Sequence, residues 1–243
     1  MTIIYQTDIG DGSQLNWERW DIRVNGTVDI TDEQPRSGNG SAEFNLTSGS
    51  DKAGLNIDFA AGDASHRLSD LTEASYEWYR DSTSTNSAVQ HPSLKLVVDG
   101  DGNLGTTNDR LTLAYEEAYN NYTVAAPTNS WVSSNATNGK WWAFHSASSG
   151  WPGAPGVVEV YNKTLNDWMT QSVTYNAWTD PITANAVVLS VRIEVGSGWN
   201  GVSKMFADNV RVVFGNASDV IANFDILPPL PDCAPDAVNN LVA

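Results

Sequence analysis

The stretch VLSVRIEVGSGWNGVSKMFADNVRVVFG, residues 188–215, carries two apolar runs on either side of a glycine-rich loop that contains a tryptophan. The first run places two sets of side chains in alternation: Val187, Leu189, Val191, Ile193 and Val195 on one face, and Val188, Ser190, Arg192 and Glu194 on the other. A period of two is typical of a strand with one buried face. We therefore predict strands over 187–195 and 206–214.

Short runs of the same kind recur along the chain, separated by Gly, Asn, Asp, Ser and Pro. The other expected strands are 2–6, 19–24, 42–46, 54–59, 75–80, 93–98, 111–116, 141–145, 156–161 and 219–224. The sequence TLNDWMTQ, 164–171, predicts a short helix capped by Thr164. This pattern predicts an all-β fold, an antiparallel sandwich or jelly roll with long decorated loops and at most one or two short helices.

A chain of 243 residues is within the range of one large β-domain. From about residue 226 the sequence ILPPLPDCAPDAVNNLVA loses its periodicity and gains proline. We therefore expect a sandwich domain over 1–225 and a Pro-rich tail or linker over 226–243, which would lead to other domains of a longer parent protein.

The net charge of −16 and the pI near 4.3 exclude several partners. Such a surface repels phosphate backbones, so we expect no nucleic-acid partner. No apolar run is long enough to span a bilayer, so we expect no membrane insertion. The lone Cys233 makes neither an internal disulfide nor a zinc site. Acidic surfaces attract cations, calcium above all, although solubility in salty surroundings explains the charge equally well.

An aspartate interrupts the second apolar run. Phe206, Asp208, Val210 and Phe214 share one parity, so Asp208 is expected to face the core with its neighbours. A buried carboxylate needs a cation or several hydrogen-bond donors.

The N-terminal sequence QTDIGDGS supplies Asp8 and Asp11, and first and last strands often neighbour one another in a jelly roll. Calcium held by Asp8, Asp11 and Asp208 is one interpretation. The other is that Asp208 accepts hydrogen bonds from backbone amides at a bulge.

The segment DGDGNLGTTND, 99–109, gathers Asp99, Asp101, Asn103 and Asp109 on one loop. It starts like an EF-hand loop but lacks the Gly at the sixth position and the Glu at the twelfth. Two interpretations remain equally open: a looser oxygen cage for calcium, or a polar hairpin loop between two strands.

Exposed tryptophans provide stacking platforms for sugar rings. Trp151 and Trp199 lie in glycine-rich loops, and one of the adjacent Trp141 and Trp142 must point outward from its strand. The ligand-binding candidates are therefore Trp151, Trp199 and Trp142, unless these rings only cover loose ends of the sandwich. Four other tryptophans are expected in the core: Trp17, Trp20, Trp78 and Trp168. Arg80 with Asp81 could grip sugar hydroxyls or form a structural ion pair.

Three segments resemble the calcium-binding jelly-roll carbohydrate-binding modules of extracellular bacterial proteins: IIYQTDIGDGSQLNW, SGNGSAEFNL and the closing ADNVRVVF. The resemblance implies a structural calcium at Asp8 or Asp11 with Asp208, and an extracellular or cell-surface location. The central region, roughly 70–215, is longer than in those modules. It looks more like a large β-domain of bacterial secreted and surface proteins.

These observations favour a non-catalytic carbohydrate-binding module that recognises a polysaccharide or glycan and is stabilised by Ca²⁺. One alternative is a structural or adhesive domain of a surface or filament assembly. The other is a glycan-cleaving enzyme, which is disfavoured because none of the three histidines lies in a recognisable motif. Glu116 and Glu117 also alternate across a strand, so they cannot face one substrate together.

Overall fold

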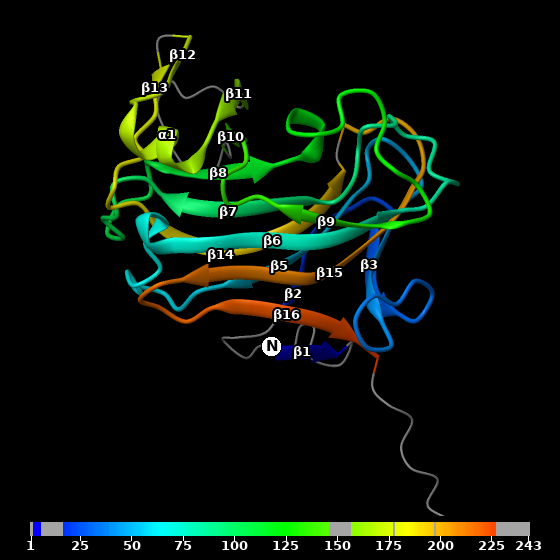
Figure 1. Cartoon of the computed structure of the whole chain (residues 1–243). Helices are drawn as coiled ribbons and strands as arrows, with labels where there is room; N and C mark the ends of the chain where they lie inside the picture. The colour runs from blue at the N-terminus through cyan, green and yellow to red at the C-terminus, as the bar shows by residue number, and fades with distance from the viewer. Residues whose placement is uncertain (1, 6–16, 146–156, 177, 197, 227–243) are drawn as a thin grey trace, which may run out of the picture.

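The computed structural model describes residues 2–5, 17–145, 157–176, 178–196 and 198–226. Two seven-stranded sheets pack face to face as a sandwich (Figure 1), which confirms the predicted all-β class. Among the described residues, every strand pair is antiparallel except β1 with β16. Within the described ranges, no helix has the length and apolar character that crossing a membrane requires.

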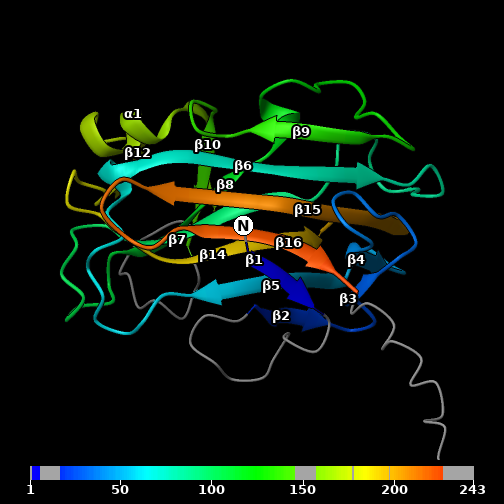
Figure 2. The same ribbon diagram turned by 60° about the horizontal axis from the view of Figure 1, so that its bottom comes forward.

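The first sheet is organised around its long strand β15. Its strands are β1 (Thr2–Tyr5), β3 (Thr27–Thr31), β4 (Ser41–Leu46), β6 (Leu71–Arg80), β9 (Trp131–Asn135), β15 (Ser203–Phe214) and β16 (Val220–Asp225). One edge of β15 pairs with β6, and the other edge pairs first with β4 and then with β16. β1 lies beside β16 (Figure 2), so the first and last strands are neighbours, as the sequence predicts.

The second sheet has the order β11-β10-β8-β7-β14-β5-β2. Its strands are β2 (Glu18–Arg23), β5 (Lys52–Asp58), β7 (Ser93–Asp99), β8 (Arg110–Tyr115), β10 (Trp141–Phe144), β11 (Val157–Lys163) and β14 (Val187–Gly196). The short strands β12 (Thr174–Tyr175) and β13 (Trp178–Thr179) form a separate pair, and two 3₁₀ turns span Leu68–Asp70 and Glu117–Tyr119.

The predicted helix is present as α1 (Leu165–Thr170). Thr164 caps it, because its hydroxyl accepts from the Asp167 amide while the Asp167 carboxylate accepts from the Thr164 amide at 2.9 Å. This capping box satisfies two amides that the first turn leaves unpaired. Leu165 and Trp168 point into the core.

Each predicted strand range contains a strand, but β3, β9, β12 and β13 were not predicted. β3 and β9 lie at ends of the first sheet, where β3 pairs with β4 and β9 pairs with β6. Edge strands are solvated on more sides, so their sequences TVDIT and WVSSN carry too few apolar residues for the pattern to stand out.

Two bulges change which side chains face the core. In β14 the register shifts between Val188 and Ser190, so Val188 is buried in the core while Leu189 lies on the outward face. In β15 the register shifts at Asn209, whose φ is +50°. A bulge reverses the alternation beyond it. The prediction that the side chains of each run alternate without interruption is therefore wrong, because each strand contains a bulge.

Candidate functional site

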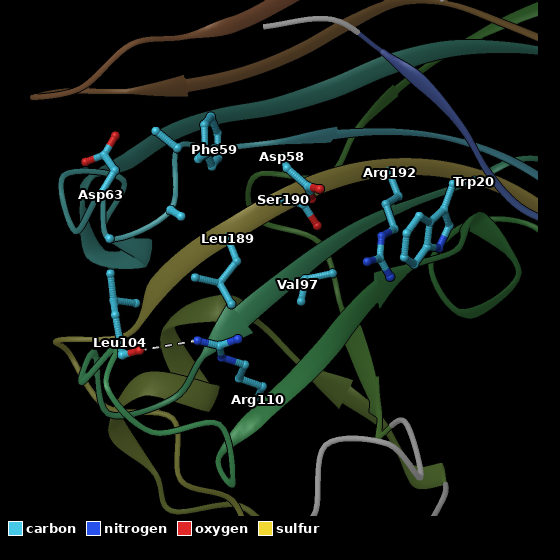
Figure 3. Close-up of a pocket in the computed structure, with 13 residues that line it drawn as sticks. Trp20, Asp58, Phe59, Asp63, Val97, Leu104, Arg110, Leu189, Ser190 and Arg192 are labelled. Carbon is cyan, nitrogen blue, oxygen red and sulfur yellow. Dashed lines mark hydrogen bonds between the residues drawn. The ribbon is translucent and has the colours of Figure 1, made fainter. Parts of the chain in front are cut away.

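A groove of about 450 Å³ lies on the outward face of the second sheet, the face turned away from the first sheet. It is lined by Trp20, Asp58, Phe59, Ala60, Ala61, Gly62, Asp63, Val97, Leu104, Arg110, Leu189, Ser190 and Arg192 (Figure 3). These residues come from β2, β5, β7, β8 and β14 and from the loops after β5 and β7. A groove of this size, with apolar walls and a few polar groups, is typical of a small-ligand site.

One wall of the groove is a tryptophan stacked with an arginine. The guanidinium carbon of Arg192 lies 4.2 Å from the centroid of the Trp20 ring, and Arg192 Nε donates to Asn56 Oδ1 at 2.8 Å. Burial lowers the pKa of Arg192, and no salt bridge holds it among the residues that the structure describes. Its terminal nitrogens can therefore donate to oxygens of a ligand.

The floor of the groove is mixed in character. Val97 and Leu189 present apolar surface, and the Ser190 hydroxyl between them and Asp58 is buried without a hydrogen-bond partner (Figure 3). Asp58 and Asp63 supply carboxylates at the rim. A buried polar atom without a partner costs free energy.

The same face carries a buried ion cluster next to the groove. The Glu194 carboxylate, 1% exposed, is 2.8 Å from Lys52 Nζ and hydrogen-bonds Lys95 Nζ. Burial alone raises the pKa of Glu194, but the two ammonium groups outweigh it and lower the pKa to about 2. Lys95 also lies 5.2 Å from the centroid of the Phe144 ring.

The adjacent tryptophans of β10 divide between the two faces. Trp141 is fully buried in the core, and Trp142 is half-buried on the outward face, 5.3 Å from the Phe144 ring. The prediction that only one of the two faces outward is confirmed. Trp142 lies on β10, three strands from β14, and is not part of the groove lining.

The acidic loop between β7 and β8 brings three of its four predicted ligands together. Carboxylate oxygens of Asp99, Asp101 and Asp109 lie within 4.8 Å of one another. Asp99 is fully buried, Asp109 is 7% exposed, and Oδ1 of each has no hydrogen-bond partner. Burial, and next the Asp109 carboxylate, raise the pKa of Asp99.

Local geometry holds this loop in a compact shape. The Asn103 amide donates to Asp101 Oδ1 at 2.7 Å, and exposed Asn103 accepts from the Gly105 amide through its own side chain. Gly102 has φ +77°, and a Cβ there would lie 2.2 Å from the Asn185 carbonyl oxygen. Only glycine fits this position.

Asp208 makes the backbone-amide hydrogen bonds that the second of its two interpretations expects. It is fully buried on the outer face of the first sheet rather than in the core, at the point where β15 changes partner from β4 to β16. Its carboxylate accepts from the Ser37 amide at 3.0 Å and the Phe224 amide at 2.9 Å. Burial, partly opposed by these bonds, raises the pKa of Asp208 to about 6. Asp8 and Asp11 lie outside the described residues.

Arg80 is buried, 3% exposed, and does not reach the surface as a ligand contact would require. Its Nη2 donates to Asn86 O and Asn86 Oδ1, both at 3.0 Å, so it orders the loop that follows β6. Asp81 accepts from the Thr83 amide at 2.8 Å instead of pairing with Arg80. The arrangement favours a structural role for both residues, although not as the ion pair that the sequence suggested.

Trp199 is half-buried and packs against the core, and the Gly198 amide donates to the Gly49 carbonyl at 2.9 Å. This placement favours the covering role over the exposed platform. Trp151 lies outside the described residues.

Trp17, Trp78 and Trp168 are core residues, as predicted, but Trp20 is not: it is half-buried at the groove. The sequence missed it because a register shift between Trp20 and Arg23 breaks the alternation of β2. The outward parity of Ser190 and Arg192 was a signal that the sequence did contain.

No protein-family model matches this chain, and no curated protein matches its sequence. Among solved structures it is similar to the Family 11 Carbohydrate-Binding Module from Clostridium thermocellum in complex with a beta-1,3-1,4-mixed-linked tetrasaccharide, with 15% identity and a TM-score of 0.39 over 86% of this chain and 94% of that chain. It is also similar to the Family 11 Carbohydrate-Binding Module of the cellulosomal cellulase Lic26A-Cel5E of Clostridium thermocellum, with 14% identity and a TM-score of 0.37 over 86% of this chain and 93% of that chain.

A structure from a study of carbohydrate-binding modules of the beta-sandwich super family gives 11% identity and a TM-score of 0.40 over 84% of this chain and 59% of that chain. With identities and TM-scores this low, the function of the chain has to be argued from its own groove.

Proposed function

We propose that this chain is a non-catalytic carbohydrate-binding module that holds a polysaccharide or glycan in the groove on the outward face of the second sheet. The observation that carries the proposal is the Trp20 ring beside the Arg192 guanidinium at the groove wall. In this proposal the aromatic contact comes from the half-buried Trp20 on a strand, and not from the loop residue Trp199.

A sugar ring presents an apolar face and a rim of hydroxyls, and the groove offers a counterpart to both. The half-buried Trp20 ring and the Leu189 side chain can cover the apolar face. Arg192 can donate to the hydroxyls and Asp58 can accept from them. The mixture of one aromatic wall with convergent polar groups therefore suits a glycan better than an apolar ligand.

The groove supports binding better than cleavage. A glycosidase needs two carboxyl groups across the scissile bond, one of them an acid with a raised pKa. Hydrogen bonds from Ser65 lower the pKa of Asp63, which is the opposite of what a general acid needs. We accordingly expect no release of reducing ends when the protein is incubated with any polysaccharide that it binds.

Replacing Trp20 by alanine is expected to weaken glycan binding by about 1–3 kcal/mol, roughly 5- to 150-fold, by analogy with base stacking on aromatic rings. The measurement is affinity gel electrophoresis against a panel of neutral and acidic polysaccharides, followed by calorimetry with oligosaccharides of those that retard the protein.

The matched control is Trp131→Ala, which removes a half-buried ring from β9 on the other sheet. It should leave the affinity unchanged. Equal losses for both variants would contradict the proposed groove. No retardation of the wild-type chain by any polysaccharide would instead favour the structural or adhesive alternative.

We also propose that Ca²⁺ stabilises the chain at Asp99, Asp101 and Asp109. An ion that binds only the folded state stabilises it by about 2.7 kcal/mol at one hundred times its Kd. Chelation with EDTA is therefore expected to lower the melting temperature of the wild-type chain and to leave that of Asp109→Asn unchanged. A wild-type melt that does not respond to EDTA would contradict this site. An extracellular or cell-surface location, where calcium and polysaccharides are both available, is part of the same proposal.

A further inference from the structure

The acidic loop and the groove share a wall. Arg110 and Leu104 both line the groove, and both belong to the segment that carries the acidic cluster, defined as Asp99, Asp101 and Asp109. Arg110 Nε donates to Asp99 Oδ2 at 3.3 Å, and its Nη2 donates to the Leu104 carbonyl at 3.4 Å (Figure 3). The position of Asp99 therefore sets the position of one side of the groove.

Charge and hydrogen bonding both point to a cation at the cluster. The cluster has three carboxylates, and Arg110 is the one cation paired with them among the described residues. The four side chains together therefore carry a net charge of −2. One divalent ion neutralises that charge. The Oδ1 atoms of Asp99 and Asp109 are buried without partners, and buried carboxylate oxygens of this kind require a cation or donors.

In each of the two buried carboxylates, Oδ2 accepts a hydrogen bond and Oδ1 has no partner. Oδ2 of Asp99 holds Arg110, and Oδ2 of Asp109 accepts from the Asp101 amide at 2.8 Å. Both Oδ1 atoms remain for an ion. Each of Asp99, Asp101 and Asp109 has a carboxylate oxygen within 4.8 Å of the others, close enough for Ca²⁺, whose bonds to oxygen are about 2.3–2.6 Å long, to bridge the three residues. An ion there leaves the Arg110 contact intact.

We propose that Ca²⁺ in the acidic cluster fixes the groove wall formed by Leu104 and Arg110, so that calcium and glycan bind cooperatively. The proposal rests on the glycan-binding function proposed for the groove. Without the ion, repulsion between Asp99 and Asp109 favours open arrangements of the loop, and the wall moves with it. With the ion, Asp99 is held between the metal and Arg110. Arg110 is thus a positioning residue that links the two sites.

The test measures each ligand in the presence and absence of the other. Calorimetry with CaCl₂ alone gives the calcium affinity, and calorimetry with an oligosaccharide that the wild-type chain binds gives the glycan affinity. Calcium should tighten glycan binding by about 5- to 150-fold, the usual range of coupling, and the glycan should tighten calcium binding by the same factor.

Three variants separate the steps. Asp109→Asn should lose calcium binding at least tenfold and lose the effect of calcium on the glycan, whereas the control Asp32→Asn, an exposed acid outside the cluster, should lose neither. Arg110→Gln should keep calcium binding, since the ion uses the Oδ1 atoms, but its glycan affinity should no longer depend on calcium.

Hydrogen exchange gives a readout that does not need the glycan: Ca²⁺ should slow exchange of the amides over 100–110 in the wild-type chain. Calcium binding with an unchanged glycan affinity would overturn the coupling and leave the proposed function standing. Slowed exchange over 100–110 with no glycan bound under any condition would overturn the proposed function, and with it the coupling. Absence of any calcium binding would overturn the cation site itself.

Discussion

Replacing Glu194 by glutamine is expected to lower the free energy of unfolding by about 3–5 kcal/mol, because the change leaves the buried Lys95 ammonium group without its carboxylate and leaves Lys52 with Asp21 alone. Lys52 and Lys95 are 7% and 6% exposed, and both contact the Glu194 carboxylate. Burial lowers the pKa of Lys95 even with Glu194 present. Urea denaturation at neutral pH measures the loss as a lower midpoint.

The matched control is Glu73→Gln. Glu73 also forms an ion pair, with Arg211 at 2.7 Å, but the two side chains are 35% and 40% exposed. Exposed pairs contribute about 0–1 kcal/mol, so the control should unfold close to the wild-type midpoint. The double variant Glu194→Gln with Lys95→Met should recover part of the loss, since it removes the ammonium group that lost its carboxylate, while Lys52 keeps Asp21 at 2.7 Å. Similar losses for Glu194→Gln and Glu73→Gln would show that the cluster is effectively solvated.

Acid is expected to remove about 3 kcal/mol of stability through His91 alone. The ring is 1% exposed and stacks on Trp78 with centroids 4.5 Å apart. Its Nε2 accepts from the Glu117 amide at 2.9 Å, so Nδ1 carries the proton and donates to the Pro92 carbonyl at 2.7 Å. A second proton would face the Glu117 amide proton. Burial lowers the pKa of His91 from 6.5 to about 4, and the nearby Arg80 charge acts in the same direction.

The sign follows from the two states. The unfolded chain takes up a proton near pH 6.5 and the folded chain only near pH 4, so the His91 contribution is complete above pH 6.5 and is lost as the pH falls toward 4. Asp180 and Asp208 act in the opposite sense, because burial raises the pKa of each to about 6. Asp180 and Asp208 are present in the wild type and in each variant, so their effects cancel in the difference in free energy of unfolding. The pH dependence of that difference therefore reports on His91.

The measurement is the free energy of unfolding of wild type and His91→Gln between pH 7 and pH 4. The wild type should be the more stable at pH 7, and its advantage should shrink by about 3 kcal/mol at pH 4. Tyr122→Leu is the control: it removes another ring that packs against Trp78, with ring centroids 6.1 Å apart, and keeps the His91 imidazole. The difference in free energy of unfolding between Tyr122→Leu and wild type should be the same at pH 7 and at pH 4. A His91→Gln gap that is also constant would contradict the buried neutral imidazole.

Local patterns in the sequence were enough to define most of the strands and the helix of this fold. The alternation of Val191, Ile193 and Val195 with Arg192 and Glu194 predicts β14 and its two faces, because a strand has a fixed period of two whatever it packs against. The capping signal at Thr164 predicts α1 for the same reason: the interacting groups are three residues apart.

The candidate site depended on contacts between distant segments. The Asp99 loop was visible as a cluster because its carboxylates are close in sequence, although burial of two of them is decided by the packing of loop 180–186 on loop 100–109. Trp20 and Arg192 are far apart in sequence and meet only because β5 pairs with both β2 and β14. No local pattern records that neighbour relation.

The sequence by itself determined most of the strands, the short helix, the acidic loop and the outward parity of Ser190 and Arg192, because each depends on residues a few positions apart. Tertiary structure alone decided which face holds a groove, that Trp20 lies in it, and that Trp199 packs against the core. It also decided that Asp208 accepts a backbone hydrogen bond from β16 at the point where the partner of β15 changes from β4 to β16. A bulge reverses parity at a single residue, and strand order joins segments far apart in the chain, so neither can be inferred from periodicity.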